Sequence, residues 1–303
     1  MCKNVKYFLY YTIMINGFIK DNYVITSHNC GFFSCCSVIL HNIVEYINLN
    51  KTLPLSDSSN SFSWYKKEKR DITYEYFENV NQNVDVHDVI NPIDYKESYQ
   101  FNNYNLDYNV TSIVNRYFAP STQIKKIIHN MEVKYHIDYN NICVLFYRGN
   151  DKITETKLCE YNDYLIYANK IMQMNPNVVF LIQSDETEFI QFMSERFPNS
   201  IFFKDEARHM NKCNSTVDHV MHDKNDVFSK YYLAITIIMS KCKYIVCGSG
   251  NCSIWIMLYR GNNRNVCQYL NGSWYDTIDA VELKNPLDEI SIVDLLNKNN
   301  IMK

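Results

Sequence analysis

The stretch Ile142-Cys-Val-Leu-Phe-Tyr147 is a short apolar run, and the polar turn Arg148-Gly-Asn-Asp-Lys152 follows it directly. Residues 161–174 then carry apolar side chains at helical spacing, and Pro176 ends that pattern. A short apolar run bounded by a polar turn is typical of a strand that is buried on both faces of a sheet. The pattern therefore predicts a buried strand, a polar turn and a helix in succession.

The same alternation continues to residue 270. Further strands are expected at 178–182, 201–203, 244–247 and 265–270, and further helices at 186–197, 228–239 and 253–259. Short apolar strands that alternate with helices form right-handed crossover units on a parallel sheet. This half of the chain is therefore predicted to be a Rossmann-like, doubly wound α/β domain.

The first 140 residues are less periodic. Strands are expected at 23–26 and 52–55, and helices at 34–49 and 121–137, the second of which begins after the capping residue Ser121. Residues 79–115 show no clear pattern, and residues 286–297 are predicted to form a final amphipathic helix. A smaller α/β domain with long loops fits this half best.

Composition excludes several classes of protein. The 303 residues are 47% hydrophobic, which is enough for a sizeable core, and they carry a net charge of −3. Because a binder of polyanions needs a basic surface, nucleic acid is not an expected partner. No two of the 11 cysteines have the paired spacing of a zinc site, so no metal site is expected.

The N-terminus bears on localisation. Residues 7–15 are apolar and follow Lys3 and Lys6, which resembles the start of a signal peptide. The stretch is too short to span a bilayer, and no later segment is expected to reach that length. We expect a soluble, cytoplasmic protein without a strong membrane signal, with a secretory or membrane-associated protein as the alternative.

The polar turns after the strands are the expected ligand site, since ligands of open parallel sheets bind beyond the carboxyl ends of the strands. These turns are residues 148–152, 183–186 and 248–253, and three of the chain's 7 glycines fall in them. Arg148 can direct two donors at a phosphate, and the last turn opens a helix whose amides can hold an anion. The alternatives are an Arg148–Asp151 ion pair and a turn that only caps its helix. No Gly-x-Gly-x-x-Gly or Gly-Lys-Ser/Thr motif follows a strand, so no nicotinamide, flavin or P-loop nucleotide is expected.

Four segments, taken in order, resemble the GT-B fucosyltransferases, a group that contains the α1,6-, α1,2- and protein O-fucosyltransferases. Residues 143–152 resemble that family's His-x-Arg-Arg-x-Asp-Lys segment, and residues 179–185 its strand that ends in Thr/Ser-Asp. Residues 243–253 are similar to its strand with a Ser-rich turn, and residues 30–41 to its N-terminal glycine loop and helix.

The resemblance implies a GT-B-like fold, with two Rossmann-like domains facing a cleft. The acceptor-side domain would be residues 1–138, the donor-binding domain residues 139–275, and residues 276–303 a helix packed across both. The implied activity is an inverting, metal-independent transfer of a sugar from GDP-fucose to a hydroxyl of a glycan or protein, with no cofactor. Arg148 matches the arginine that contacts the donor β-phosphate. The implied donor-binding residues also include Gly31, Phe32, Lys152, Ser184, Asp185, Gly248, Ser249, Gly250, Asn251 and Ser253.

An acceptor hydroxyl also needs a carboxylate to take its proton, and Glu155, Asp151 and Asp185 are the candidates. The sequence departs from the family at four places, one of which is Gly250-Asn251 in place of a Ser-Ser pair. Phe146 stands where a histidine is usual, Gly149 where a second arginine is usual, and Ile235 where the α1,6 enzymes have an aspartate. The alternatives are therefore a GT-B transferase with another nucleotide sugar and a non-catalytic carbohydrate- or nucleotide-binding protein.

Overall fold

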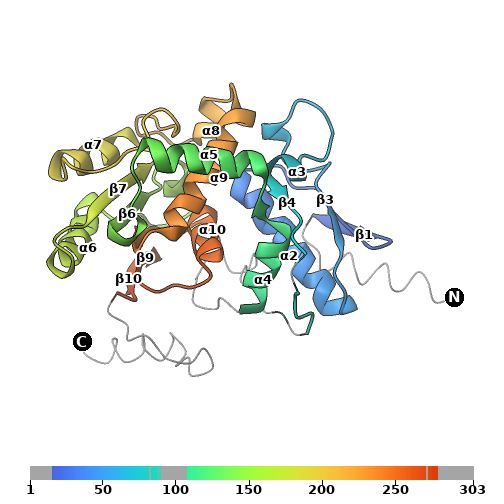
Figure 1. Ribbon diagram of the computed structural model, residues 1–303. Coiled ribbons are helices and arrows are strands. Elements are labelled where there is room, and N and C mark those ends of the chain that lie inside the picture. The colour runs from blue at the N-terminus through green and yellow to red at the C-terminus, as the bar shows by residue number, and fades with distance from the viewer. Residues whose placement is uncertain (1–15, 82, 88, 90–107, 271, 279–303) are drawn as a thin grey trace.

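The computed structural model describes residues 16–81, 83–87, 89, 108–270 and 272–278, and all structural statements below refer to these residues. Its largest sheet has the strand order β10-β9-β8-β6-β7 (Figure 1). The strands are β6 (Ile142–Tyr147), β7 (Val179–Ser184), β8 (Tyr244–Cys247), β9 (Val266–Leu270) and β10 (Ser273–Asp276). The first four are parallel, as predicted, and β10 pairs antiparallel with β9 at the edge.

Helices cover both faces of this sheet. On one face lie α6 (Tyr161–Met174) and α7 (Thr187–Arg196), and on the other α9 (Asn225–Lys241) and α10 (Asn251–Arg260). All six residues of β6 are buried, because alternate side chains point to opposite faces and each face is covered. Cys143, Leu145 and Tyr147 join the cluster under α6 and α7, whereas Ile142, Val144 and Phe146 join the cluster under α9 and α10.

The N-terminal half is built around one long helix, α2 (Phe32–Asn50). Beside it lies a small sheet of β1 (Gly17–Lys20), β2 (Tyr23–Thr26) and β3 (Leu55–Asp57), in which β2 pairs antiparallel with β1 and parallel with β3. The other elements are η1 (Ser63–Tyr65), α3 (Thr73–Tyr76), the antiparallel pair β4 (Phe77–Glu78) and β5 (Ala119–Pro120), α4 (Tyr108–Tyr117) and α5 (Thr122–Lys134). Helix α5 packs against α9 and so joins the two halves (Figure 1).

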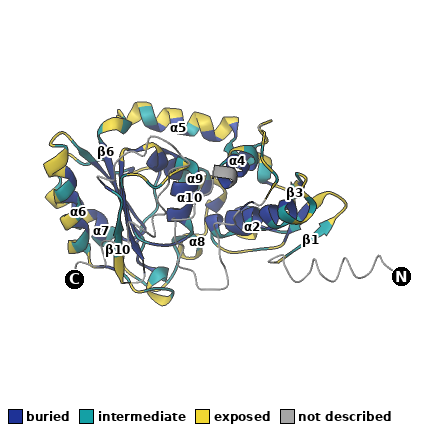
Figure 2. Cartoon of the chain, turned by 90° about the horizontal axis from the view of Figure 1, so that it is seen from below, coloured by how far each residue is buried: buried dark blue, intermediate teal, exposed yellow. Residues whose placement is uncertain are grey.

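One hydrophobic core runs through both halves. Helices α2, α9 and α10 are mostly buried, as Figure 2 shows, and their side chains belong to a single cluster. Trp255 of α10 is fully buried, with its ring against those of Phe33 and Phe118. Its indole Nε1 donates a hydrogen bond of 2.9 Å to Ser37 Oγ of α2. The start of α2 is thereby fixed to the large sheet's helices.

Helix α2 is also longer than predicted. The sequence predicted residues 34–49, whereas the helix spans Phe32–Asn50 and is long and apolar enough, by length and composition, to cross a membrane. The expectation that no segment reaches that length is therefore wrong for α2. Most of the helix is buried in the core just described.

Other expectations differ from the structure in detail. The strand predicted at 201–203 is only a single bridge between Ile201 and Leu181, because the chain turns back at once, with Lys204 N donating to Phe202 O. The strand predicted at 52–55 begins only at Leu55, and α4 and β10 were not predicted. The helix after Ser121 is confirmed, with the Ser121 hydroxyl accepting from Ile124 N. The apolar stretch 7–15 and the predicted helix 286–297 lie outside the described residues.

The first prediction follows from the hydrogen bond between Trp255 of α10 and Ser37 of α2. Ser37→Ala leaves the buried indole N–H of Trp255 without an acceptor, so we expect the free energy of unfolding to fall by about 1–3 kcal/mol in urea denaturation. Ser194→Ala, at the partly exposed surface of α7, is the control and should cost less than about 0.5 kcal/mol. Equal losses in the two variants would contradict the structural role of this bond.

Candidate functional site

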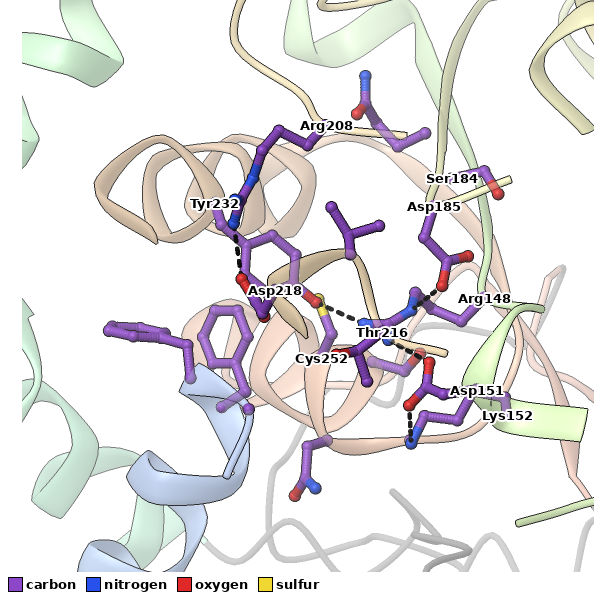
Figure 3. A pocket seen from close by; sticks show the side chains of 18 of the residues that line it. Arg148, Asp151, Lys152, Ser184, Asp185, Arg208, Thr216, Asp218, Tyr232 and Cys252 are labelled. Carbon is purple, nitrogen blue, oxygen red and sulfur yellow. Dashed lines mark hydrogen bonds and ion pairs between the residues drawn. The ribbon is translucent and has the colours of Figure 1, made fainter. Parts of the chain in front are cut away.

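A cavity of about 400 Å³ lies at the carboxyl ends of β6, β7 and β8 (Figure 3). Residues 30–34 and Trp64 close it from the N-terminal half. The connection that leaves β6 runs to β7 on one side of it, whereas the connection that leaves β8 runs to β9 on the other side, so the strand order reverses between β6 and β8. A crevice at such a point is the general ligand site of open α/β sheets.

Nearly all of the residues that the sequence singled out meet in this cavity. Its lining includes Gly31, Phe32, Arg148, Asp151, Lys152, Glu155, Ser184, Asp185, Ser249, Gly250, Asn251 and Ser253. Gly248 lies outside the lining, because its amide continues the sheet by donating to Phe146 O at 3.4 Å. The turns after three strands are thus one surface, and the roles of the residues on it stay predictions.

Arg148 is held by three partners from three elements. Its Nε donates to Asp185 Oδ2 at 2.9 Å, one terminal nitrogen to Asp151 Oδ1 at 2.9 Å, and the other to the Tyr232 hydroxyl at 3.0 Å. The side chain is only 20% exposed. A guanidinium has five N–H donors, so two remain for a ligand. The Arg148–Asp151 ion pair, given above as the alternative to a phosphate contact, is present, but it is one part of a larger network that orients the arginine.

The same network shifts the pKa values of Arg148 and Asp151. Burial alone would lower the pKa of Arg148, but Asp185, Tyr232 and Asp151 raise it well above its usual range. Burial alone would raise the pKa of Asp151, but Arg148 and Lys152 bring it below the ordinary value. Asp151 is therefore a carboxylate, and its low proton affinity makes it a poor general base.

The other two candidate bases, Asp185 and Glu155, differ in their hydrogen-bond partners. Asp185 is buried, and its second oxygen accepts the amide of Gly149 at 3.0 Å. One oxygen of Asp185 therefore accepts from the backbone after β6, and the other accepts from Arg148. Glu155 pairs with Lys152 through Oε2, and its side chain is 29% exposed. Of the three carboxylates, Glu155 is the one with an oxygen left for a substrate.

The turn between β8 and α10 begins the helix without a side-chain cap. Gly250 is the N-cap residue and has φ 135°, a conformation that side chains rarely adopt. The alternative, in which the turn only caps its helix through Asn251 or Ser253, is therefore wrong. The carbonyl oxygen of the Asn251 side chain is buried and has no partner among the described residues. The free amides at this helix start face the same cavity as Lys152, so positive potential reaches it from two sides.

Gly149 stands where the family has a second arginine, and its neighbours leave no room for a side chain. A Cβ at this position would collide with the carboxylate of Glu186 and would lie 2.6 Å from the ring of Tyr147. Glu186 is fully buried, accepts a hydrogen bond from the Tyr161 hydroxyl through Oε2, and has no partner at Oε1 in the described part of the chain. Burial raises its pKa, and nearby Asp185 adds to the shift, against the bond from Tyr161.

The lining also includes residues that the sequence did not single out as site residues, among them Arg208, Asp218 and Tyr232. Arg208 donates to Asp218 Oδ1 at 2.6 Å, and the hydroxyl of Tyr65 in η1 donates to Asp218 Oδ2 at 3.0 Å. Asp218 lies in a polar segment that resembles any solvated loop, and Tyr232 lies in an apolar helix. No local sequence signal links Asp218 to Tyr65 or Tyr232 to Arg148, because these partners are 153 and 84 residues apart.

The similarities to known proteins are structural. No protein-family model and no curated protein matches the sequence. The fucosyltransferase NodZ from Bradyrhizobium has a similar structure, at 10% identity over 86% of this chain and 100% of that chain, with a TM-score of 0.49. NodZ α-1,6-fucosyltransferase soaked with GDP-fucose gives 9% identity, the same coverage and a TM-score of 0.49. The structure of NodZ α-1,6-fucosyltransferase co-crystallised with GDP is 10% identical in sequence. The match covers 85% of this chain and 99% of that chain, with a TM-score of 0.48.

These neighbours belong to the group that the four sequence segments resemble. The likeness is one of structure at about a tenth identical residues, so the function proposed below is argued from this chain's own side chains.

The contact between Gly149 and Glu186 makes the second prediction. Gly149→Ala should lower the free energy of unfolding by about 1–3 kcal/mol, because the added methyl displaces a buried carboxylate. The loss should be smaller in a Glu186→Ala background, where only Tyr147 opposes the methyl. Gly31→Ala is the matched control, since a Cβ there meets nothing within 4 Å. Equal losses at the two glycines would contradict the collision.

The third prediction concerns pH. Because the pKa of Glu186 is raised in the folded state, its contribution to stability is full below the ordinary value of 4.5 and is lost as pH rises through the folded pKa. Glu186→Gln should therefore be more stabilising, relative to the parent, at about pH 8 than at about pH 5. Urea denaturation at both pH values measures this, and a pH-independent difference would contradict it.

Proposed function

We propose that this protein is a GT-B-type glycosyltransferase that takes a sugar from a nucleoside diphosphate, with GDP-fucose as the first donor to test. The observation that carries the proposal is the setting of Arg148. Its guanidinium is oriented by Asp185, Asp151 and Tyr232 and keeps two free donors at a cavity that also holds Lys152 and the start of α10. Such a set of donors suits a diphosphate.

The chemistry follows from where charge develops. When the bond between the anomeric carbon and the diphosphate breaks, negative charge grows on the leaving phosphate. Arg148, Lys152 and the amides at the start of α10 would meet that charge. We infer that the chain's own cations and dipoles supply the stabilisation, so that the transfer is metal-independent and needs no cofactor.

The acceptor would attack from the opposite side of the sugar, which inverts the anomeric centre. Its hydroxyl oxygen forms the new bond to the anomeric carbon while the bond to the diphosphate breaks, and a carboxylate takes the hydroxyl proton. Glu155 is the best placed of the three candidates, because Asp185 and Asp151 are occupied by Arg148. The acceptor is proposed to be a hydroxyl of a glycan or protein.

The proposal includes a division of labour between the two halves. Residues 139–275, with the doubly wound sheet, would bind the donor, and residues 1–138 would face it across the cavity. Support comes from the lining, which combines residues 30–34 with the ends of β6, β7 and β8. The helix proposed for residues 276–303 and the proposed cytoplasmic location rest on the sequence alone.

A non-catalytic nucleotide- or carbohydrate-binding protein is the second candidate. One observation favours it: every carboxylate in the cavity lining already has a hydrogen-bonding or ionic partner. They are Asp151, Glu155, Asp185, Glu206 and Asp218. A base needs a carboxylate oxygen that can reach the acceptor hydroxyl, and each of these carboxylates would have to give up or share a partner to do so.

The fourth prediction tests the role of Arg148 in calorimetric titrations with GDP, UDP, dTDP and CDP. Arg148→Lys keeps the charge but loses the planar fork, so we expect the affinity for the preferred nucleotide to fall by about ten- to a hundredfold. Arg196→Lys, on the exposed surface of α7, is the matched control and should bind as the parent does.

Arg148 also holds two carboxylates in place, so its replacement should lower stability as well. Thermal unfolding must therefore show that the variant is folded at the titration temperature, and Lys152→Gln serves as a less embedded second variant. Folded variants that both bind as the parent does would refute the proposal. Release of free sugar from the donor identifies a transferase, whereas binding without any turnover favours the second candidate.

A further inference from the structure

Behind Arg148 the cavity continues between β6, β7 and α9, and its walls there are apolar. Phe146, Ile235 and Met239 line this part and are at most 3% exposed. Phe146 lies two residues before Arg148, which places it about 7 Å further along the strand into the sheet. Met239 lies two helical turns beyond Tyr232 on α9. We call this part of the cavity the inner pocket.

One polar side chain lines the inner pocket from the sheet, that of Gln183 in β7. Gln183 is the direct partner of Phe146 in the parallel register, so the two side chains lie on the same face, the one that α9 covers. Gln183 is only 4% exposed. Its Nε2 is buried and has no hydrogen-bond partner among the residues that the structure describes.

An unpaired carboxamide in this position costs stability. A buried polar group without a partner lowers the free energy of unfolding by about 1–3 kcal/mol. In the great majority of cases buried polar groups are therefore paired. The two ends of a carboxamide are interchangeable, so Gln183 can present a donor or an acceptor to the pocket. Either end calls for a complementary polar atom within a ligand.

The apolar side chains and the single carboxamide of the inner pocket suit an apolar ring with a polar edge. In a nucleotide sugar the base lies on the far side of the ribose from the diphosphate. With the diphosphate at Arg148, a base that points inward would reach the level of Phe146 and Gln183. An aromatic side chain can stack on a base, and a glutamine can form paired hydrogen bonds with a base edge.

We propose that Gln183 is the residue that determines base specificity, by hydrogen-bonding the edge of the donor nucleobase in the inner pocket. This inference rests on the proposed function, since it needs a nucleotide at Arg148. The departures at Phe146 and Ile235 then have a common reason. They remove polar groups from the two walls, and selection among bases passes to the carboxamide of Gln183.

The test distinguishes binding of the nucleobase from binding of the phosphates. The parent and Gln183→Leu are titrated with GDP, UDP, dTDP, CDP and inorganic pyrophosphate. We expect the parent to bind one nucleotide more tightly than the others. In Gln183→Leu the ratio of the affinities should fall by at least about tenfold, while the affinity for pyrophosphate stays unchanged. Gln191→Leu, at an exposed position of α7, is the matched control and should keep the preference.

The other outcomes overturn the inference in distinguishable ways. If Gln183→Leu changes only thermal stability and keeps the order of nucleotides, the carboxamide holds a water and does not read a base. If the parent binds pyrophosphate as tightly as any nucleotide, the phosphate site stands and the base site is wrong. If the parent binds none of the five ligands, the proposed function fails as well. Gln183→Met, of similar length, replaces the leucine variant if that variant does not fold.

Discussion

The charge of Arg148 is largely removed from water, and the ends of the central strands are arranged around it. A buried cation is stable only with close counter-charges and hydrogen bonds. Asp185 supplies both from the end of β7, the Tyr232 hydroxyl adds an acceptor from α9, and Asp151 closes the turn after β6. The guanidinium is thus oriented before any ligand arrives, at the edge of the cavity that Arg148 lines.

Much of this could be read from local sequence. The apolar run of β6 predicted a doubly covered strand because each of its residues is buried on one face or the other, and the carboxyl-end rule then identified the turns that line the cavity. The partners Tyr232 and Asp218 could not be predicted. Tyr232 lies 84 residues after Arg148, and Asp218 lies 153 residues after Tyr65, so only the tertiary fold brings them together. The edge strand β10 was missed since it is short and only partly buried.

The positions where the chain departs from the family are explained by their neighbours. Gly149 is small because the buried carboxylate of Glu186 fills the adjacent space. Phe146 of β6 and Ile235 of α9 both line the cavity, so the two differences alter one surface. With glycine at position 149, the positive groups that line the cavity are Arg148, Lys152, Arg208 and the start of α10.

The packing of Trp255 against α2 has a consequence for motion. Its indole is fully buried between the rings of Phe33 and Phe118 and is tied to Ser37, within a core that both halves share. Swinging the halves apart as rigid lobes about a hinge would expose that core to water, at a high cost in free energy. Ligand exchange should therefore depend on small rearrangements of the surrounding loops.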